Sequence, residues 1–137
     1  MKSMHFLEKV EVQSFIDRRG NLGVSELGVN PKFIIKRIYY INRVPSEASR
    51  GAHGHKQLQQ IFYALSGSFH LMVTDGVNTD SVTVSEMSNG YFLPAGLWRD
   101  LDNFSSDCVC LVLASEPYDK SDYIHDYEEF RNWRALK

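Results

Sequence analysis

Short runs of β-branched and aromatic residues recur at regular spacing through the middle of this chain, and they limit the folds that it can form. These runs occupy residues 60–65, 69–74, 81–84, 91–96, 98–101 and 108–114. Turns that contain glycine separate several of them, as at Ser66-Gly67 and Asp75-Gly76. Short strands spaced in this way are typical of an all-β sandwich or barrel. We therefore predict an all-β fold with one small double-sheet barrel.

The sequence before this region predicts a hairpin arm and one further strand. Residues 9–16 alternate between apolar and polar side chains as a half-buried strand does, and residues 17–21 supply a turn. Residues 33–41 are rich in the β-branched and aromatic side chains that favour a strand. Alternate residues of that strand share one face. On one face lie Arg37, Tyr39, Ile41 and Arg43.

The last part of the chain predicts a helix. Asp119 can cap a helix that begins shortly after Pro117. One face of this helix would carry Tyr123, Tyr127, Phe130 and Arg134. With 137 residues and 43% hydrophobic content, the chain can bury one good core but not two. We expect a single domain over residues 1–137, with the hairpin as an N-terminal arm and a short C-terminal helix against the barrel.

Composition and charge exclude several classes of partner. Fifteen basic and seventeen acidic residues give a net charge of −2, so the broad basic surface typical of nucleic-acid binding is not expected. No apolar run approaches the roughly 20 residues that span a membrane, and the start lacks the apolar region of a secretory signal. We therefore expect a cytoplasmic protein without membrane contact. Cys108 and Cys110 lie in a strand-like run and are expected to be buried free thiols.

The main chemical signal is the stretch from Arg50 to Lys56, which contains His53 and His55 just before a strand-like run. On a strand, these two imidazoles would point to the same face. Two histidines on one face are too polar for an ordinary core, so we expect that face to line a cavity. The alternative is a pair of solvated histidines at a strand end.

Two motifs in the chain resemble those of the cupin superfamily. His53-x-His55, followed by Gln60 and Gly67, resembles the first motif, and Pro94-x-Gly96-x-x-Arg99 resembles the second. The resemblance implies a cupin double-stranded β-helix, a jelly-roll barrel. In metal-binding cupins the ligands are three histidines and a glutamate, whereas here two of those places hold Gln60 and Arg99. Because a guanidinium has no lone pair and would repel a cation, we expect no metal ion and no cofactor.

A closer resemblance covers nearly the whole chain. Arg50-Gly-x-His-x-His-Lys56, Trp98-Arg99 and the stretches 110–115 and 118–130 resemble the WxcM-like nucleotide-sugar 3,4-ketoisomerases. This implies that dTDP-4-keto-6-deoxy-D-glucose is converted to a 3-keto sugar, which an aminotransferase then turns into a 3-amino sugar for surface polysaccharide or an antibiotic. The chain departs from the family pattern at Gly54, Lys120 and His125, where other residues are common.

The reaction suggests roles for individual residues. A base must take the proton from C3, an enediol must be stabilised, and a proton must reach C4; no redox cofactor is needed. His53 or His55 is the candidate base, since histidine titrates near neutral pH. The family resemblance favours His53, and spacing alone does not separate the two. Tyr39 is the candidate acid or carbonyl hydrogen-bond donor.

Other residues are candidates for binding the substrate. Arginine and lysine form charge-assisted hydrogen bonds to phosphate, and Trp98 or a tyrosine can stack on thymine. Gln60 is either a polar core anchor or a substrate contact. The candidate substrate-binding residues are Arg19, Arg43, Arg50, Lys56, Gln60, Trp98 and Arg99.

The sequence is compatible with two alternative functions, and it also suggests an oligomeric state. The alternatives are a 3,5-epimerase-like enzyme on the same nucleotide sugar and a cupin that only binds a sugar or nucleotide. Long edge strands tend to be covered in native proteins, and related cupins pair through N-terminal arms, so we expect a homodimer in which Arg19 reaches the partner's cavity. Whether C4 is reprotonated to the gluco or the galacto product does not follow from the sequence.

Overall fold

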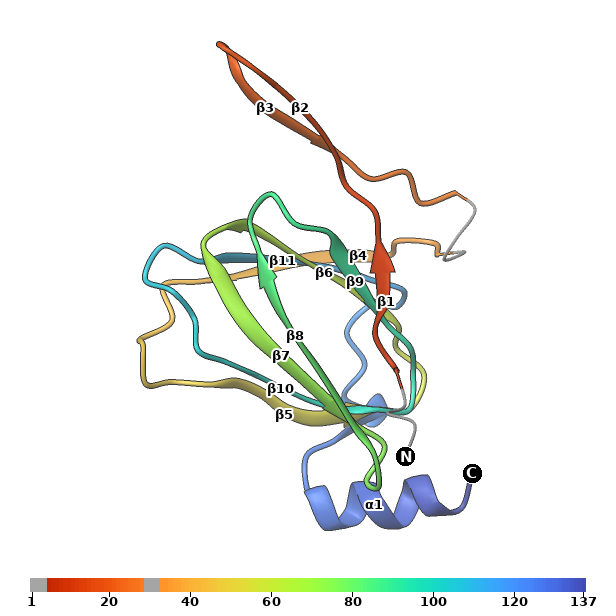
Figure 1. Cartoon of the computed structure of the whole chain (residues 1–137). Coiled ribbons are helices and arrows are strands. Elements are labelled where there is room, and N and C mark those ends of the chain that lie inside the picture. Colours follow the sequence, from red (N-terminus) through yellow and green to blue (C-terminus); the bar gives the residue numbers. More distant parts are fainter. Residues whose placement is uncertain (1–4, 29–32) are drawn as a thin grey trace.

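Two five-stranded antiparallel sheets face each other in the computed structural model, which describes residues 5–28 and 33–137 (Figure 1). The first sheet has the order β1-β9-β6-β11-β4. Its strands are β1 (Glu8–Val10), β9 (Gly90–Leu93), β6 (Gln60–Ser66), β11 (Val109–Ala114) and β4 (Arg37–Asn42). The second sheet has the order β12-β5-β10-β7-β8. Its strands are β12 (Tyr123–Ile124), β5 (Arg50–His55), β10 (Trp98–Asp102), β7 (Ser68–Thr74) and β8 (Thr79–Ser85).

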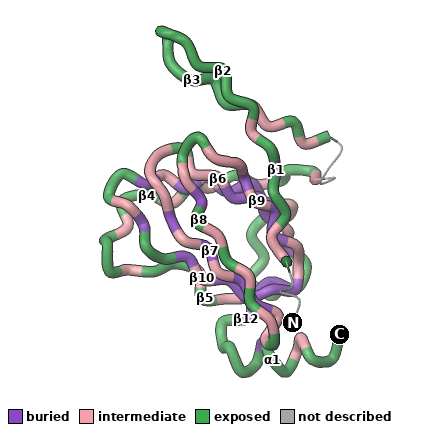
Figure 2. The backbone as a smooth tube through the Cα atoms, in the orientation of Figure 1, coloured by how far each residue is buried: buried purple, intermediate pink, exposed green. Residues whose placement is uncertain are grey.

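Apolar side chains from both sheets fill the space between them. The main cluster contains Phe62 of β6, Phe69 and Leu71 of β7, and Val112 of β11, all almost fully buried. Cys108 and Cys110 belong to the same cluster as free thiols, as predicted. Figure 2 shows that the buried residues lie along the two sheets. The all-β prediction with a jelly-roll arrangement is confirmed, and so is its short C-terminal helix.

The N-terminal hairpin projects away from the sheets (Figure 1). It consists of β2 (Gln13–Asp17) and β3 (Gly20–Val24), which pair from Gln13 with Val24 to Asp17 with Gly20. Every residue of β2 is exposed, as are the first four residues of β3 (Figure 2). The hairpin therefore has too few contacts with the rest of this chain to bury its own apolar side chains.

The C-terminal segment differs from the helix predicted from Asp119 onward. Asp119 caps only a short 3₁₀ turn, η1 (Lys120–Asp122), and Tyr123 then starts β12, which pairs with β5. The helix α1 (Tyr127–Ala135) begins later, with Asp126 as its N-cap accepting from Glu128 N at 2.9 Å. Backbone pairing of Tyr123 with His55 gives this segment a partner that the helical periodicity of the sequence does not reveal.

Helix α1 packs against β5 and β12 through Phe130, which is fully buried with Trp98 and Ile124. Gly54 permits this packing, because a Cβ at that position would lie 2.7 Å from the ring of Phe130. The helix thus supports the strand that carries both histidines. In the described part of the chain, no helix is long and apolar enough to cross a membrane.

Candidate active site

A β-bulge places the histidines of β5. In the pairing of β5 with β10, Arg99 lies opposite His53 and Asp100 lies opposite Gly51, so Ala52 is an extra residue in its strand. Gly51 and Ala52 both have positive φ values, of 90° and 57°. Glycine suits the first position, since a Cβ there would lie 3.0 Å from the carbonyl oxygen of Arg99. The bulge brings the carbonyl of Gly51 next to the ring of His53.

The two histidines meet edge to face but have different hydrogen-bond partners. Nδ1 of His53 lies 3.0 Å from the carbonyl oxygen of Gly51, and Nδ1 of His55 lies 3.1 Å from a carboxylate oxygen of Asp122. A carbonyl oxygen and a carboxylate both accept, so Nδ1 carries the proton in each neutral ring. Nε2 of each ring therefore keeps its lone pair.

Burial and nearby positive charge keep both rings neutral. Burial and the charge of Arg99 lower the pKa of His53 to about 4. The same two causes, together with His53 and Arg37, lower the pKa of His55 to about 2. At neutral pH both histidines therefore have the unprotonated form that a general base requires.

A cavity of about 520 Å³ opens beside His53. It lies between β4, β5, β6 and β10, and the segment around β12 closes one wall. The lining residues are Arg37, Tyr39, Ile41, Ser49, Arg50, Gly51, His53, Phe62, Arg99, Leu101, Tyr123 and His125. His55 is 1% exposed and lines a neighbouring cavity of about 540 Å³, which shares Arg37 and Tyr123 with the first.

Arg99 is a buried cation in the cavity wall, with 1% of its surface exposed. Its hydrogen bonds go to two neutral groups, the carbonyl of Leu97 at 3.0 Å and the side-chain oxygen of Gln60. Burial lowers its pKa to about 10, so the guanidinium is still charged at neutral pH. A buried charge without a bonded carboxylate favours a ligand that brings negative charge to this part of the cavity.

The residues at the metal-ligand positions of cupins do not fit a divalent cation. Gln60 uses its oxygen to accept from Arg99, so the guanidinium occupies the space beside the two histidines. Across residues 5–28 and 33–137, no three His, Cys, Asp or Glu side chains are grouped as a metal site would need. Metal-independent chemistry remains a prediction, supported by the identity of these two residues.

Comparison with known proteins connects this cavity to a family. The family model described as FdtA, "WxcM-like, C-terminal", matches residues 5–135. The chain belongs to the FdtA family. The resemblance to WxcM-like proteins seen in the sequence is thereby confirmed.

Curated and solved relatives of this FdtA-family chain are similar along nearly their whole length. The TDP-4-oxo-6-deoxy-α-D-glucose 3,4-oxoisomerase of Aneurinibacillus thermoaerophilus is 38% identical over 126 residues, which cover 92% of this chain and 91% of the relative. A 3,4-ketoisomerase from Helicobacter canadensis is 36% identical, with a TM-score of 0.87 over 94% of this chain and 97% of that one. A sugar 3,4-ketoisomerase from Thermoanaerobacterium thermosaccharolyticum in complex with TDP is 31% identical, with a TM-score of 0.90 over 97% of both chains.

An epimerase from Mycobacterium tuberculosis has the same fold at a greater distance. It is 15% identical, with a TM-score of 0.74 over 90% of this chain and 72% of that one. This likeness supports the jelly-roll architecture alone.

The structure brings several of the predicted site residues together. His53, Tyr39, Arg50 and Arg99 all line the cavity of about 520 Å³ beside β5, the site cavity. Gln60 is 1% exposed and lies behind the cavity wall, between Tyr39 and Arg99. Its position favours the predicted polar anchor over a direct substrate contact.

Four other candidate residues do not line this cavity. Arg43 has a positive φ of 57° just after β4, and this turn takes it out of the strand alternation that was expected to align it with Tyr39. Lys56 lines the neighbouring cavity with His55. Trp98 is buried against Tyr127 and Phe130, which favours a structural role for it over the predicted thymine stacking. Arg19 lies at the end of the projecting hairpin, where it pairs with Asp17.

Four further residues line the two cavities without a role predicted from the sequence: Arg37, Asp122, Tyr123 and His125. The ring of Tyr123 lies 5.0 Å from His53 and 4.2 Å from His55 between centroids, and it stacks on His125 at 5.3 Å. Only Arg37 carried a signal in the sequence, because it shares a strand face with Tyr39. The other three reach the site through the pairing of β12 with β5.

Proposed function

We propose that this chain is a 3,4-ketoisomerase that converts TDP-4-keto-6-deoxy-D-glucose into a TDP-linked 3-keto-6-deoxy hexose. The main structural support is the convergence of His53, Tyr39 and Arg99 on one cavity. These side chains supply a neutral base, a hydroxyl donor and a buried cation, which together suit proton transfer next to a carbonyl. The family and its oxoisomerase and ketoisomerase relatives support the same activity.

In this proposal His53 is the base. Its Nε2 has a free lone pair and its ring lines the cavity, whereas His55 is buried behind it. Nε2 of His53 takes the proton from C3, and the charge that develops on the former C4 carbonyl oxygen is stabilised by Tyr39 and Arg99. A proton is then delivered to C4 as the hydroxyl at C3 becomes a ketone. C3 is oxidised as C4 is reduced, so the reaction needs no external oxidant.

The diphosphate of the nucleotide requires cations near the cavity mouth. Arg50 and Arg37 line the same cavity, and Arg50 is exposed to solvent. Guanidinium groups bind phosphate oxygens through paired, charge-assisted hydrogen bonds. We therefore assign the diphosphate to Arg50 and Arg37, since Arg43 and Lys56 do not line this cavity. The TDP complex of the Thermoanaerobacterium relative supports a nucleotide as the recognition group.

Product analysis tests this function directly. The protein is incubated with TDP-4-keto-6-deoxyglucose, and the carbonyl carbon of the product is located by ¹³C NMR. A ketoisomerase moves the carbonyl from C4 to C3, and the resulting ketone is the group that an aminotransferase needs to form a 3-amino sugar. An epimerase leaves the carbonyl at C4, and a protein that only binds the sugar produces neither turnover nor exchange of substrate hydrogens with solvent.

We further infer that the chain acts as a homodimer that pairs through its N-terminal hairpin. Phe15 and Leu22 lie opposite each other in the hairpin and are 57% and 62% exposed. Ile38 and Tyr40 on the outer face of β4 are 61% and 67% exposed. Apolar surface of this kind on an arm and on a sheet favours pairing between copies. In such a dimer, Arg19 can reach the partner's cavity from the end of the hairpin.

Light scattering tests the dimer. Wild-type protein should have twice the mass of the chain, and the double substitution Phe15→Glu with Leu22→Glu should yield monomers. Lys9→Glu, a charge change at the exposed Lys9 of β1, is the control and should leave the mass unchanged. A monomeric wild-type protein would contradict the inference.

A further inference from the structure

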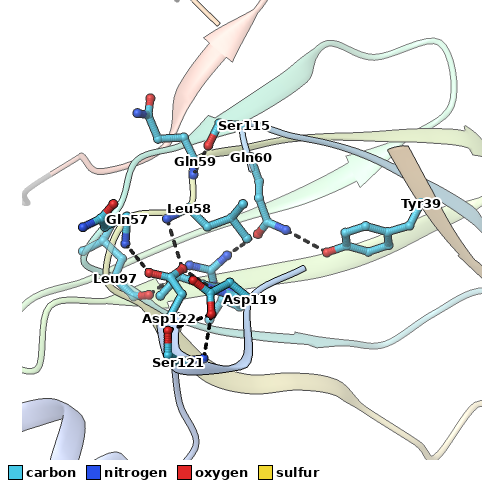
Figure 3. A network of polar contacts seen from close by, with 12 residues as sticks. Tyr39, Gln57, Leu58, Gln59, Gln60, Leu97, Ser115, Asp119, Ser121 and Asp122 are labelled. Atoms are coloured by element: carbon cyan, nitrogen blue, oxygen red, sulfur yellow. Dashed lines mark hydrogen bonds and ion pairs between the residues drawn. The ribbon is translucent and has the colours of Figure 1, made fainter. Parts of the chain in front are cut away.

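Three polar side chains, Arg99, Gln60 and Tyr39, form a hydrogen-bonded row along the wall of the site cavity. Figure 3 labels two of them, Gln60 and Tyr39. Nη1 of Arg99 donates to Oε1 of Gln60, and Nε2 of Gln60 donates to the hydroxyl oxygen of Tyr39 at 2.8 Å. Gln60 and Arg99 are each 1% exposed, and Gln60 is absent from the cavity lining that contains Tyr39 and Arg99. Gln60 can therefore act on a bound substrate only through its two neighbours.

The chemistry of the three groups fixes the direction of both hydrogen bonds. A guanidinium has only N–H donors, so the group of Gln60 that faces Arg99 is its carbonyl oxygen. The amide N–H₂ then faces Tyr39, whose oxygen accepts. Because the amide group that faces Tyr39 has no lone pair to offer, the hydroxyl proton of Tyr39 cannot be used in this bond. That proton remains available to a group in the cavity that Tyr39 lines.

We propose that Gln60 is a positioning residue that fixes the direction of the Tyr39 hydroxyl, so that its proton is delivered into the cavity to the carbonyl oxygen of the substrate. This role rests on the proposed ketoisomerase function and deepens it. A glutamate, the usual cupin residue at this place, would accept from Tyr39 and withhold the same proton.

The proposed step balances in protons. The C3–H bond breaks and its proton goes to Nε2 of His53, while the O–H bond of Tyr39 breaks as an O–H bond forms at the former C4 carbonyl. The product of this half-reaction is a neutral enediol. The Tyr39 phenolate that remains is held by the N–H of Gln60 and by the charge of Arg99. In the second half-reaction, the hydroxyl proton at C3 goes to Tyr39 and protonated His53 gives its proton to C4, so both side chains regain their starting states.

Two substitutions of Gln60 distinguish an effect on the direction of the Tyr39 hydroxyl proton from an effect on stability. Gln60→Glu keeps the size of the side chain and both contacts, and it adds an ion pair with Arg99. Its carboxylate, however, accepts a hydrogen bond from the Tyr39 hydroxyl, where the amide of Gln60 donates one. Gln60→Met removes both contacts and leaves that proton free. We expect Gln60→Glu to melt near the wild-type temperature and to lose about 100-fold in kcat with little change in KM. Gln60→Met should melt lower and yet retain the higher kcat of the two variants. The reverse order of kcat would overturn the proposal.

A double-mutant cycle tests whether the effect passes through Tyr39. Adding Tyr39→Phe to Gln60→Glu should cause almost no further loss of kcat, because the proton that phenylalanine lacks is already withheld. If the two losses multiply, Gln60 acts independently of Tyr39 and the proposal is wrong.

A measurement without turnover distinguishes this proposal from the proposed function. In protein labelled with ¹³Cζ-tyrosine, the signal of Tyr39 is assigned by its absence in Tyr39→Phe, and its titration is followed by NMR. Gln60→Glu should move the midpoint to higher pH, since a carboxylate that accepts the hydroxyl proton opposes its loss. An unchanged midpoint would refute the role of Gln60 even if the wild-type protein is an active ketoisomerase. A shifted midpoint in a protein without isomerase activity would instead place the error in the proposed function.

Discussion

The imidazole rings of His53 and His55 meet at nearly a right angle, with 4.7 Å between their centroids and 89° between their planes. They share one face of β5, as their spacing predicts, yet their Nδ1 partners are a backbone carbonyl for His53 and the carboxylate of Asp122 for His55. The two rings consequently face different cavities. This difference allows the base to be assigned by experiment.

We expect His53→Asn to reduce kcat by about 10²–10⁴-fold, the usual contribution of a positioned base. Affinity for TDP, measured by calorimetry, should change little, because the nucleotide is assigned to Arg37 and Arg50. His55→Asn is the matched control. It removes a side chain of the same type one step further from the substrate, so its kcat should exceed that of His53→Asn. The opposite ranking would move the base to His55.

The pH dependence of kcat/KM should reflect the environment of His53. Its neutral form is the active base, and protonation below its pKa removes activity. Because burial and Arg99 lower this pKa from 6.5 to about 4, kcat/KM should stay level through pH 6.5 and fall only as the pH drops through about 4. Circular dichroism over the same range shows whether the fold persists. A decline centred near pH 6.5 in folded protein would mean that the essential group is not His53 in this environment.

The strands and the histidine pair could be predicted from the sequence because both depend on local patterns. Alternation in residues 33–41 places Tyr39 and Arg37 on one face of β4, and the cupin motifs identify Gln60 and Arg99 as substitutes for metal ligands. The contact of Asp122 with His55, by contrast, joins residues 67 positions apart, and the local sequence around Asp122 does not predict it. The prediction of a helix from Asp119 was wrong for the same reason, because Tyr123 pairs with a strand, β5, that is distant in the sequence.

Gly54 illustrates a departure from the family pattern that only the structure explains. A Cβ at this position would lie 2.7 Å from Cδ1 of Phe130, which is fully buried. We expect Gly54→Ala to lower the free energy of unfolding by about 1–3 kcal/mol through overpacking. Chemical denaturation measures this loss. Combining Gly54→Ala with Phe130→Leu should cost less than the sum of the two single changes, because the smaller side chain makes room for the methyl group. Strict additivity would argue against the clash.

Asp122 should contribute to stability and catalysis together. Its carboxylate accepts from Nδ1 of His55. It also accepts from the backbone N–H of Gln57 at 2.8 Å and from that of Leu58 at 3.2 Å (Figure 3), so it connects η1 to the turn between β5 and β6. Hydrogen bonds to a charged group are worth about 1.5–3 kcal/mol each. Asp122→Ala should therefore lower the free energy of unfolding by at least about 2 kcal/mol, with a loss of kcat as His55 loses its fixed orientation.

Asp126→Ala is the control for this change. Asp126 also accepts a backbone N–H, as the N-cap of α1, but it has no bond to either histidine. Loss of a cap costs about 1 kcal/mol, and we expect kcat to be unaffected. Asp122→Ala with wild-type kcat at a temperature where it is fully folded would show that the carboxylate serves stability alone, and that His55 needs no fixed orientation for His53 to act.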